Sequence, residues 1–149
     1  MAILDRLPTR DWFIRFDVVN DDACVICGSG MESRDHLFAD CFYARNVWNV
    51  VLGLCGIRSI ADSWDQRLNW LVVSLKGKSL RTRILKLAWT GFLYHVWEER
   101  NFKFFRSISR SSEDTVKRIK EAVKIKLYSL SLHIIDDGNK ELYINWELI

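Results

Sequence analysis

The chain has 149 residues, of which 49% are hydrophobic and 28% charged, with seven Trp, one Pro and seven Gly. This apolar content is enough for one buried core, so we expect a single domain over residues 1–149 and exclude a disordered tail. No apolar run approaches the 18 residues of a membrane span, and no signal peptide is recognisable. We therefore expect a nuclear or cytoplasmic protein without a membrane partner.

The net charge of +3 is unevenly distributed. Residues 1–65 contain six Arg against ten Asp and Glu, a net −4, whereas residues 66–149 contain sixteen Lys and Arg against nine acidic residues, a net +7. An acidic segment repels phosphate and a basic segment attracts it. We therefore expect any nucleic-acid contact to lie in the second half of the chain.

The first predicted element is a short helix over about residues 10–16. Thr9 is a suitable N-cap, because its hydroxyl can accept a hydrogen bond from an amide of the first turn. Phe13 and Phe16 would lie on one side of this helix. The region from residue 18 to residue 41 is predicted to be a loop wrapped around a metal ion.

Cysteine and histidine are concentrated in that loop, in the order C-x2-C-x8-H-x4-C. A Cys-x-x-Cys turn brings two thiolates within reach of one ion, and a following His and Cys complete a tetrahedral set suited to Zn²⁺. The predicted zinc ligands are Cys24, Cys27, His36 and Cys41. Four protein ligands leave no open coordination position, so the ion would hold the structure together and not activate water.

Other roles for these cysteines agree less well with the sequence. A redox Cys-x-x-Cys pair belongs to a βαβ unit, which the residues around Cys24 and Cys27 do not predict. A disulfide framework is typical of secreted chains, and free thiols beside a metal motif indicate a reducing compartment. Gly28 and Gly30 favour the zinc interpretation, because glycine permits the tight turns of a metal knuckle.

Two helices are predicted next, over about residues 42–54 and 64–75, with residues 57–64 as a connector. Their apolar residues at helical spacing are Ala44, Val47, Trp48, Val51 and Leu52, then Trp64, Leu68, Leu71, Val72 and Leu75. Gly53 or Gly56 would end the first. For Cys55, a buried small apolar residue is favoured over a spare metal ligand.

The longest and most apolar helix is predicted over about residues 79–106, with Ser79 as N-cap. Its apolar residues cover so much of its circumference that we expect it at the centre of the core. Gly91 in its interior indicates close approach of another backbone. His95 is interpreted as a core histidine in preference to a catalytic one.

A cationic cluster lies at the start of this helix. Its members are Lys76, Lys78, Arg81, Arg83 and Lys86, and no acidic residue occurs between Asp65 and Glu98. Cations near a helix N-terminus oppose the helix dipole and repel one another, which an anionic partner would offset. Two interpretations remain open: a phosphate-binding site, or a solvated basic face that keeps the protein soluble.

A last helix is predicted from a cap at Ser111 or Ser112. Its apolar residues Val116, Ile119, Val123, Leu127 and Leu130 repeat at helical spacing, and its opposite face carries Lys117, Arg118, Lys120, Glu121 and Lys124. Lys117, Arg118 and Lys124 are included in the predicted nucleic-acid-binding surface.

The C-terminal segment is predicted to form β structure. Leu142, Ile144, Trp146 and Leu148 alternate after a turn signal at residues 136–139, which predicts a hairpin or a docking strand. An unpaired strand end and an aromatic surface would suit a protein partner or a second copy of the chain.

Several segments together resemble a known family: LPTRD at residues 7–11, the cysteine pair, ESRDHLFADC at 32–41, Val47-Trp48 and WTGFLYHVWEERN at 89–101. They are similar to the zinc-binding region downstream of the reverse transcriptase in plant LINE-type (non-LTR) retrotransposons, over roughly residues 4–130. The resemblance implies zinc on the four ligands and a nucleic-acid-binding accessory role. It also implies a fragment or a small derived gene, because a parent element carries polymerase and endonuclease regions.

We therefore predict a mainly α protein: a small helical domain with an N-terminal CCHC-type zinc knuckle and a short C-terminal β hairpin or strand. The zinc-binding part would span residues 7–56, the helical part 64–133 and the β-like segment 134–149. No catalytic grouping or glycine-rich phosphate loop is found, so an enzyme is not expected. The predicted function is non-catalytic binding of RNA or DNA, and the alternative is a domesticated protein-interaction or regulatory module with structural zinc.

Overall fold

The computed structural model describes residues 8–11, 21–58, 63–129 and 137–148. In these ranges the chain is mainly helical. Its elements are η2 (His36–Asp40, a π-helical turn), α2 (Phe42–Leu54), α3 (Trp64–Ser74), α4 (Leu80–Arg106), α5 (Ser112–Ser129), η3 (Asp137–Asn139, a 3-10 turn) and α6 (Lys140–Asn145). Among the described helices, none has the length and apolar character that crossing a membrane requires.

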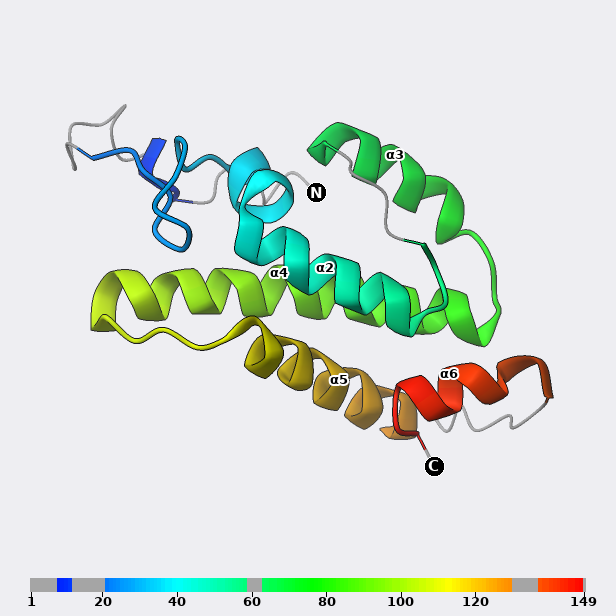
Figure 1. Ribbon diagram of the computed structural model, residues 1–149. Helices are drawn as coiled ribbons and strands as arrows, with labels where there is room; N and C mark the ends of the chain where they lie inside the picture. Colours follow the sequence, from blue (N-terminus) through cyan, green and yellow to red (C-terminus); the bar gives the residue numbers. More distant parts are fainter. Residues whose placement is uncertain (1–7, 12–20, 59–62, 130–136, 149) are drawn as a thin grey trace.

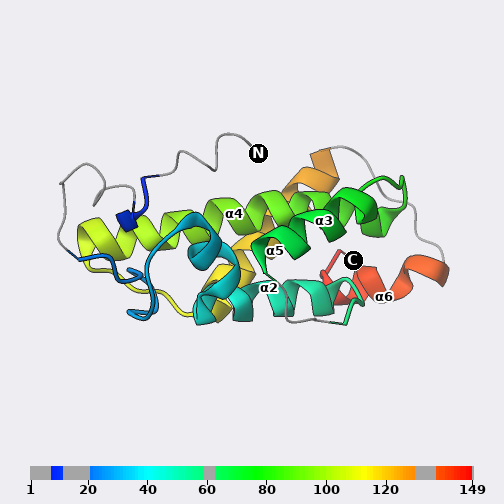
Figure 2. The ribbon, with the colours of Figure 1, turned by 90° about the horizontal axis from the view of Figure 1, so that it is seen from above.

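Helix α4 runs through the whole arrangement, as predicted for the central helix (Figure 1). α5 turns back antiparallel along it, and α2 contacts both of these helices (Figures 1 and 2). α3 packs on η2, and the segment before η2 lies over the C-terminal part of α4. The metal-binding segment is therefore held at one end of a helical layer.

The four longest predicted helices are confirmed with nearly the predicted bounds. The predicted apolar face of α2 is buried throughout, and so are Val116, Ile119, Val123 and Leu127 of α5. α3 begins with a capping box, in which Ser63 and Gln66 each accept a hydrogen bond from the other's backbone amide. Val72 of α3 was expected in the core but is 64% exposed.

Gly91 of α4 has a different neighbour from the one predicted. A Cβ atom at this position would lie 3.5 Å from Cγ2 of Ile119, so the space is filled by a side chain of α5 and not by another backbone. The small residue still serves close helix packing, because it lets the β-branched Ile119 reach the surface of α4.

Aromatic rings and one buried arginine join the helices. Trp48 of α2 and Trp64 of α3 lie 5.2 and 5.8 Å, centroid to centroid, from Trp89 of α4. Arg67 is 1% exposed, and its Nη1 donates to the carbonyl of Phe38 at 2.6 Å. Its guanidinium also lies 5.4 Å from the ring centroid of Trp48, so α3 is tied both to η2 and to α2.

The predicted C-terminal β structure is wrong for the residues described there. Leu142, Tyr143 and Trp146 are buried together while Ile144 is 60% exposed, which is the period of a helix and not of a strand. Asn145 Nδ2 donates to the carbonyl of Leu54 at 3.2 Å, which ties α6 to the end of α2. The described residues 137–148 therefore offer no terminal strand with which a partner chain could pair.

Other predictions are corrected or left open. The predicted loop of residues 18–41 contains a short bridge between Ala23 and Met31 and the helical turn η2. Cys55 is fully buried, as predicted, and burial raises the pKa of its thiol to about 11. Most of the predicted helix over residues 10–16, together with Leu130 and residues 134–136, lies outside the described residues.

The buried guanidinium of Arg67 can be tested by Arg67→Met. This change keeps the apolar stem but leaves the carbonyl of Phe38 without its donor, so we expect a loss of about 1 to 3 kcal/mol in the free energy of unfolding. Urea denaturation monitored by Trp fluorescence measures it. The control is Arg58→Met at an exposed arginine, expected to stay within about 0.5 kcal/mol; equal losses would contradict the assignment.

Candidate metal centre

The four predicted ligands converge on one point. One donor atom from each of Cys24, Cys27, His36 and Cys41 lies within 4.8 Å of the others. Cys24 Sγ and Cys41 Sγ are 3.9 Å apart, and Cys27 Sγ is 3.2 Å from His36 Nε2. Around a tetrahedral Zn²⁺ these separations would be about 3.8 Å between sulfurs and about 3.6 Å between sulfur and nitrogen. All four cysteines of the chain are free thiols, so the residues present fit zinc and not a disulfide.

The first two ligands sit on a tight turn. The amide of Gly28 donates to the carbonyl of Cys24 at 2.8 Å, and the amide of Cys24 donates to the carbonyl of Gly30 at 3.0 Å. Gly28 and Gly30 adopt φ values of 71° and 73°, which glycine reaches without steric cost. The predicted role of the two glycines is confirmed.

The other two ligands are positioned by η2. His36 begins the turn and its amide donates to Ser33 Oγ at 3.1 Å, while the amide of Cys41 donates to the carbonyl of His36 at 2.6 Å. The wider π-helical turn therefore brings residues five apart onto the same side. η2 itself is anchored because Leu37, Phe38 and Ala39 are fully buried.

Two of the ligand sulfurs, those of Cys24 and Cys41, interact directly with one another. A hydrogen bond between the two sulfurs raises the pKa of Cys24, with burial adding to the effect, and lowers the pKa of Cys41. A bound divalent cation would hold both sulfurs as thiolates, as zinc sites require.

A buried ion pair ties the metal loop to α4. Glu32 is 0% and Arg100 is 1% exposed, and Arg100 Nη2 and Nε lie 2.8 and 3.1 Å from Glu32 Oε1. The carboxylate also accepts from the amide of Arg10 at 2.9 Å and, through Oε2, from the amide of Val25 at 2.9 Å. Four donors therefore satisfy one buried carboxylate, which is the condition for a charge to be tolerated in a protein interior.

A second tie lies one turn further along α4. Lys103 Nζ donates to the carbonyl of Ile26, between the two ligands of the tight turn, at 2.8 Å. Glu98 and Glu99 pair with Arg110, after the end of the helix, at 3.0 and 2.9 Å, and Arg100 reaches a residue 68 positions away. Because the partners lie far apart in the sequence, the sequence pattern does not predict these contacts.

The predicted nucleic-acid-binding residues fall into several groups. Lys76, Lys78, Arg81, Arg83 and Lys86 are all exposed around the start of α4. Residues two positions apart on a helix point about 160° apart. Arg81 thus points to the end of α2, where its Nη2 lies 3.4 Å from a Cβ position at Gly56, and away from Arg83.

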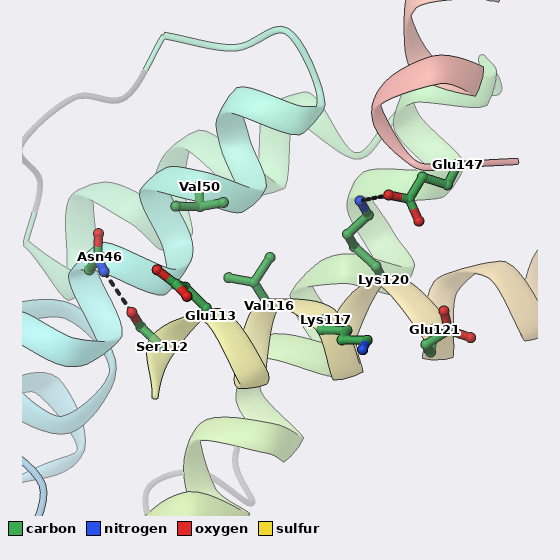
Figure 3. Close-up of a pocket in the computed structure, with 9 residues that line it drawn as sticks. All are labelled: Asn46, Val50, Ser112, Glu113, Val116, Lys117, Lys120, Glu121 and Glu147. Atoms are coloured by element: carbon green, nitrogen blue, oxygen red, sulfur yellow. Dashed lines mark hydrogen bonds and ion pairs between the residues drawn. The ribbon is translucent and has the colours of Figure 1, made fainter. Parts of the chain in front are cut away.

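The α5 residues also separate. Lys117 lines a pocket between α2 and α5 whose other charged residues are Lys120, Glu113, Glu121 and Glu147 (Figure 3). Lys124 Nζ lies 3.9 Å from Glu121 Oε1, so acidic groups are interspersed with the lysines on this side. Arg118 lies on the α4 side, near enough to His95 for its charge to contribute to lowering the pKa of that imidazole.

His95 is partly buried, as expected for a core histidine. Burial is the main cause that lowers its pKa, and the nearby Glu98 acts in the opposite direction. Its ring contacts Tyr94 edge to face at 5.1 Å. Its Nδ1 is buried and makes no hydrogen bond, with Glu98 Oε1 at 4.0 Å, so the preference for a core over a catalytic role stays a prediction.

The fold and donor set define a class: a helical protein with a closed site of three cysteines and one histidine near its N-terminus. Residues 1–48 match the family model described as zinc-binding in reverse transcriptase. The match contains all four ligands, so the predicted resemblance to a reverse-transcriptase zinc-binding domain is confirmed over residues 1–48, and Zn²⁺ is the ion that the site suits. The wider resemblance to residue 130 and the plant LINE-type origin stay predictions. No curated protein and no solved structure matches the chain.

The two glycines of the turn provide a matched test of the site. A Cβ at Gly30 would lie 3.2 Å from Cε1 of His36, whereas a Cβ at Gly28 meets no atom within 4 Å. Each alanine costs about 1 to 2 kcal/mol of backbone strain. Only Gly30→Ala should also displace the imidazole, lowering zinc affinity about 10- to 100-fold in competition with a chromophoric chelator. Equal affinities in both variants would contradict this geometry.

The buried carboxylate provides a second test. Glu32→Gln removes the charge and leaves Arg100 buried without a counter-ion, so we expect a loss of about 3 to 5 kcal/mol in the free energy of unfolding of the zinc-loaded protein. The control is Asp22→Asn, at an exposed carboxylate of the same loop, with an expected change within about 0.5 kcal/mol. A loss below about 1 kcal/mol for Glu32→Gln would show that the ion pair does not hold the loop to α4.

Proposed function

We propose that the chain is a zinc-stabilised nucleic-acid-binding module in which the metal holds the fold and a basic helical surface contacts phosphates. The observation that carries the proposal is the group of exposed cations around the start of α4, within the acid-free stretch of residues 66–97. The match of residues 1–48 to a zinc-binding region of reverse transcriptase supports the same class of ligand, because that enzyme handles nucleic acid.

The electrostatics of the helix start favour an anionic ligand. The first turn of α4 contains no acidic residue, so no negative side chain balances the positive end of the helix dipole. The nearby cations add to that positive charge. Backbone amides at a helix start and long cations together suit phosphate oxygens. A bound phosphate backbone would relieve both the dipole and the repulsion among the cations.

The metal loop itself is an unsuitable phosphate contact. Three thiolates and a neutral histidine around Zn²⁺ leave a net negative site, and Asp21, Asp22 and Asp40 are exposed beside it. Repulsion from this end would direct a polyanion towards the opposite end of α4. In the proposed function, the ion therefore stabilises the fold, and the start of α4 binds the nucleic acid.

Salt dependence tests the proposal directly. Removing one cation that binds a phosphate should reduce the slope of log K against log salt by about 0.7 to 0.9. We expect Lys78→Gln and Lys86→Gln each to do so in fluorescence anisotropy with a mixed-sequence 12-nucleotide RNA or DNA. The matched control is Arg106→Gln, which removes one exposed charge at the far end of α4 and should leave the slope unchanged. Undetectable binding of the wild-type protein at low salt would refute the function.

A further inference from the structure

We infer that the exposed face of α4 holds single-stranded nucleic acid, with the ring of Tyr94 stacked on one base and Arg83 and Lys86 contacting phosphates beside it. This inference rests on the proposed function and specifies its ligand. Three observations support it: a solvent-exposed ring, two cations on the same face of the helix, and no acidic residue in the stretch of α4 that joins them.

Tyr94 lies in the middle of α4 but not in the core. Its side chain is 63% exposed, while its neighbours Phe92 and Val96 are fully buried. The ring lies nearly at right angles to that of His95, with 5.1 Å between the two centroids, and stays exposed to solvent. An aromatic ring exposed in this way is a platform on which a base of any sequence can stack.

The two cations share the face of Tyr94. At 3.6 residues per turn, Arg83, Lys86 and Tyr94 fall within a sector of about 80° around the helix. Thr90 lies in the same sector and is also exposed. Arg83, Lys86 and Tyr94 therefore lie along one side of α4, with the two cations nearer its N-terminus and the ring near its middle.

The spacing suits a short strand. Lys86 and Tyr94 are eight residues apart, about 12 Å along the helix. A stacked strand advances about 3.4 Å per nucleotide, so this distance corresponds to about three or four nucleotides. A single strand can therefore contact the cations and place an unpaired base on the ring at the same time.

The charges around the ring complement a phosphate strand. Residues 66–97 contain no acidic residue. Glu98, the nearest acidic residue in sequence, is already paired with Arg110 at 3.0 Å.

The exposed ring distinguishes single strands from duplexes. In a duplex the faces of the bases are covered by their neighbours, so Tyr94 would have no surface on which to stack, and only the cations would contribute. A single strand exposes its bases and gains from both interactions. We therefore expect tighter binding of a 12-nucleotide single strand than of the 12-base-pair duplex of the same sequence.

The test compares Tyr94→Leu with Tyr94→Trp in the full zinc-loaded chain, using fluorescence anisotropy with these oligonucleotides. Tyr94→Leu should weaken single-strand binding about 5- to 100-fold without altering the salt slope, because no charge is removed. Tyr94→Trp should retain the affinity. The control Phe42→Leu removes an aromatic ring that is 80% exposed in the acidic half and should have no effect.

The outcomes separate this inference from the proposed function. A change of less than twofold for Tyr94→Leu, an equal loss with duplex, or wild-type preference for duplex would overturn the stacking role. If Lys86→Gln still lowers the salt slope in that case, the nucleic-acid-binding function stands and only the stacking is refuted. If the wild-type protein binds neither form of nucleic acid, both are refuted. Unchanged circular dichroism and melting of Tyr94→Leu confirm that an affinity loss is not a loss of fold.

Discussion

Convergence of three sulfurs and one imidazole on a single point is the constraint on which the rest of the structure depends. The segment from residue 21 to residue 33 has only an isolated bridge and turns as secondary structure, so its own backbone contributes little order. Zinc binding in comparable peptides contributes about 10 to 16 kcal/mol, which is enough to fold such a segment. Glu32 and Lys103 then fix the folded loop to α4, so metal and helix are parts of one unit.

The division of charge separates scaffold from recognition. The metal-bearing segment is acidic and contacts the C-terminal half of α4, while the cationic cluster of residues 76–86 lies around the N-terminal end of the same helix. A 27-residue helix is about 40 Å long. At that distance the negative metal site is screened by salt from a ligand on the basic end. α4 can therefore be anchored to the metal-binding segment at its C-terminal end and bind an anionic ligand at its N-terminal end.

Much of the fold could be predicted because its signals are local. Apolar residues at helical spacing indicated α2 to α5, and four rare donor residues in eighteen positions indicated the metal site. The C-terminal helix was missed because Leu142, Ile144, Trp146 and Leu148 alternate, although the buried Tyr143 breaks that alternation. The Glu32–Arg100 pair and the buried Arg67 were missed because charged residues are ordinarily exposed and their partners are distant in sequence.

The most direct measurement of the role of the metal is the zinc content of the purified chain, combined with its thermal unfolding before and after removal of zinc by a strong chelator. A structural site of four protein ligands predicts one zinc per chain, and loss of the cooperative unfolding transition, at least for the metal-binding segment, once the ion is removed. A chain that contains no stoichiometric zinc and melts identically with and without chelator would contradict the central role given to the ion.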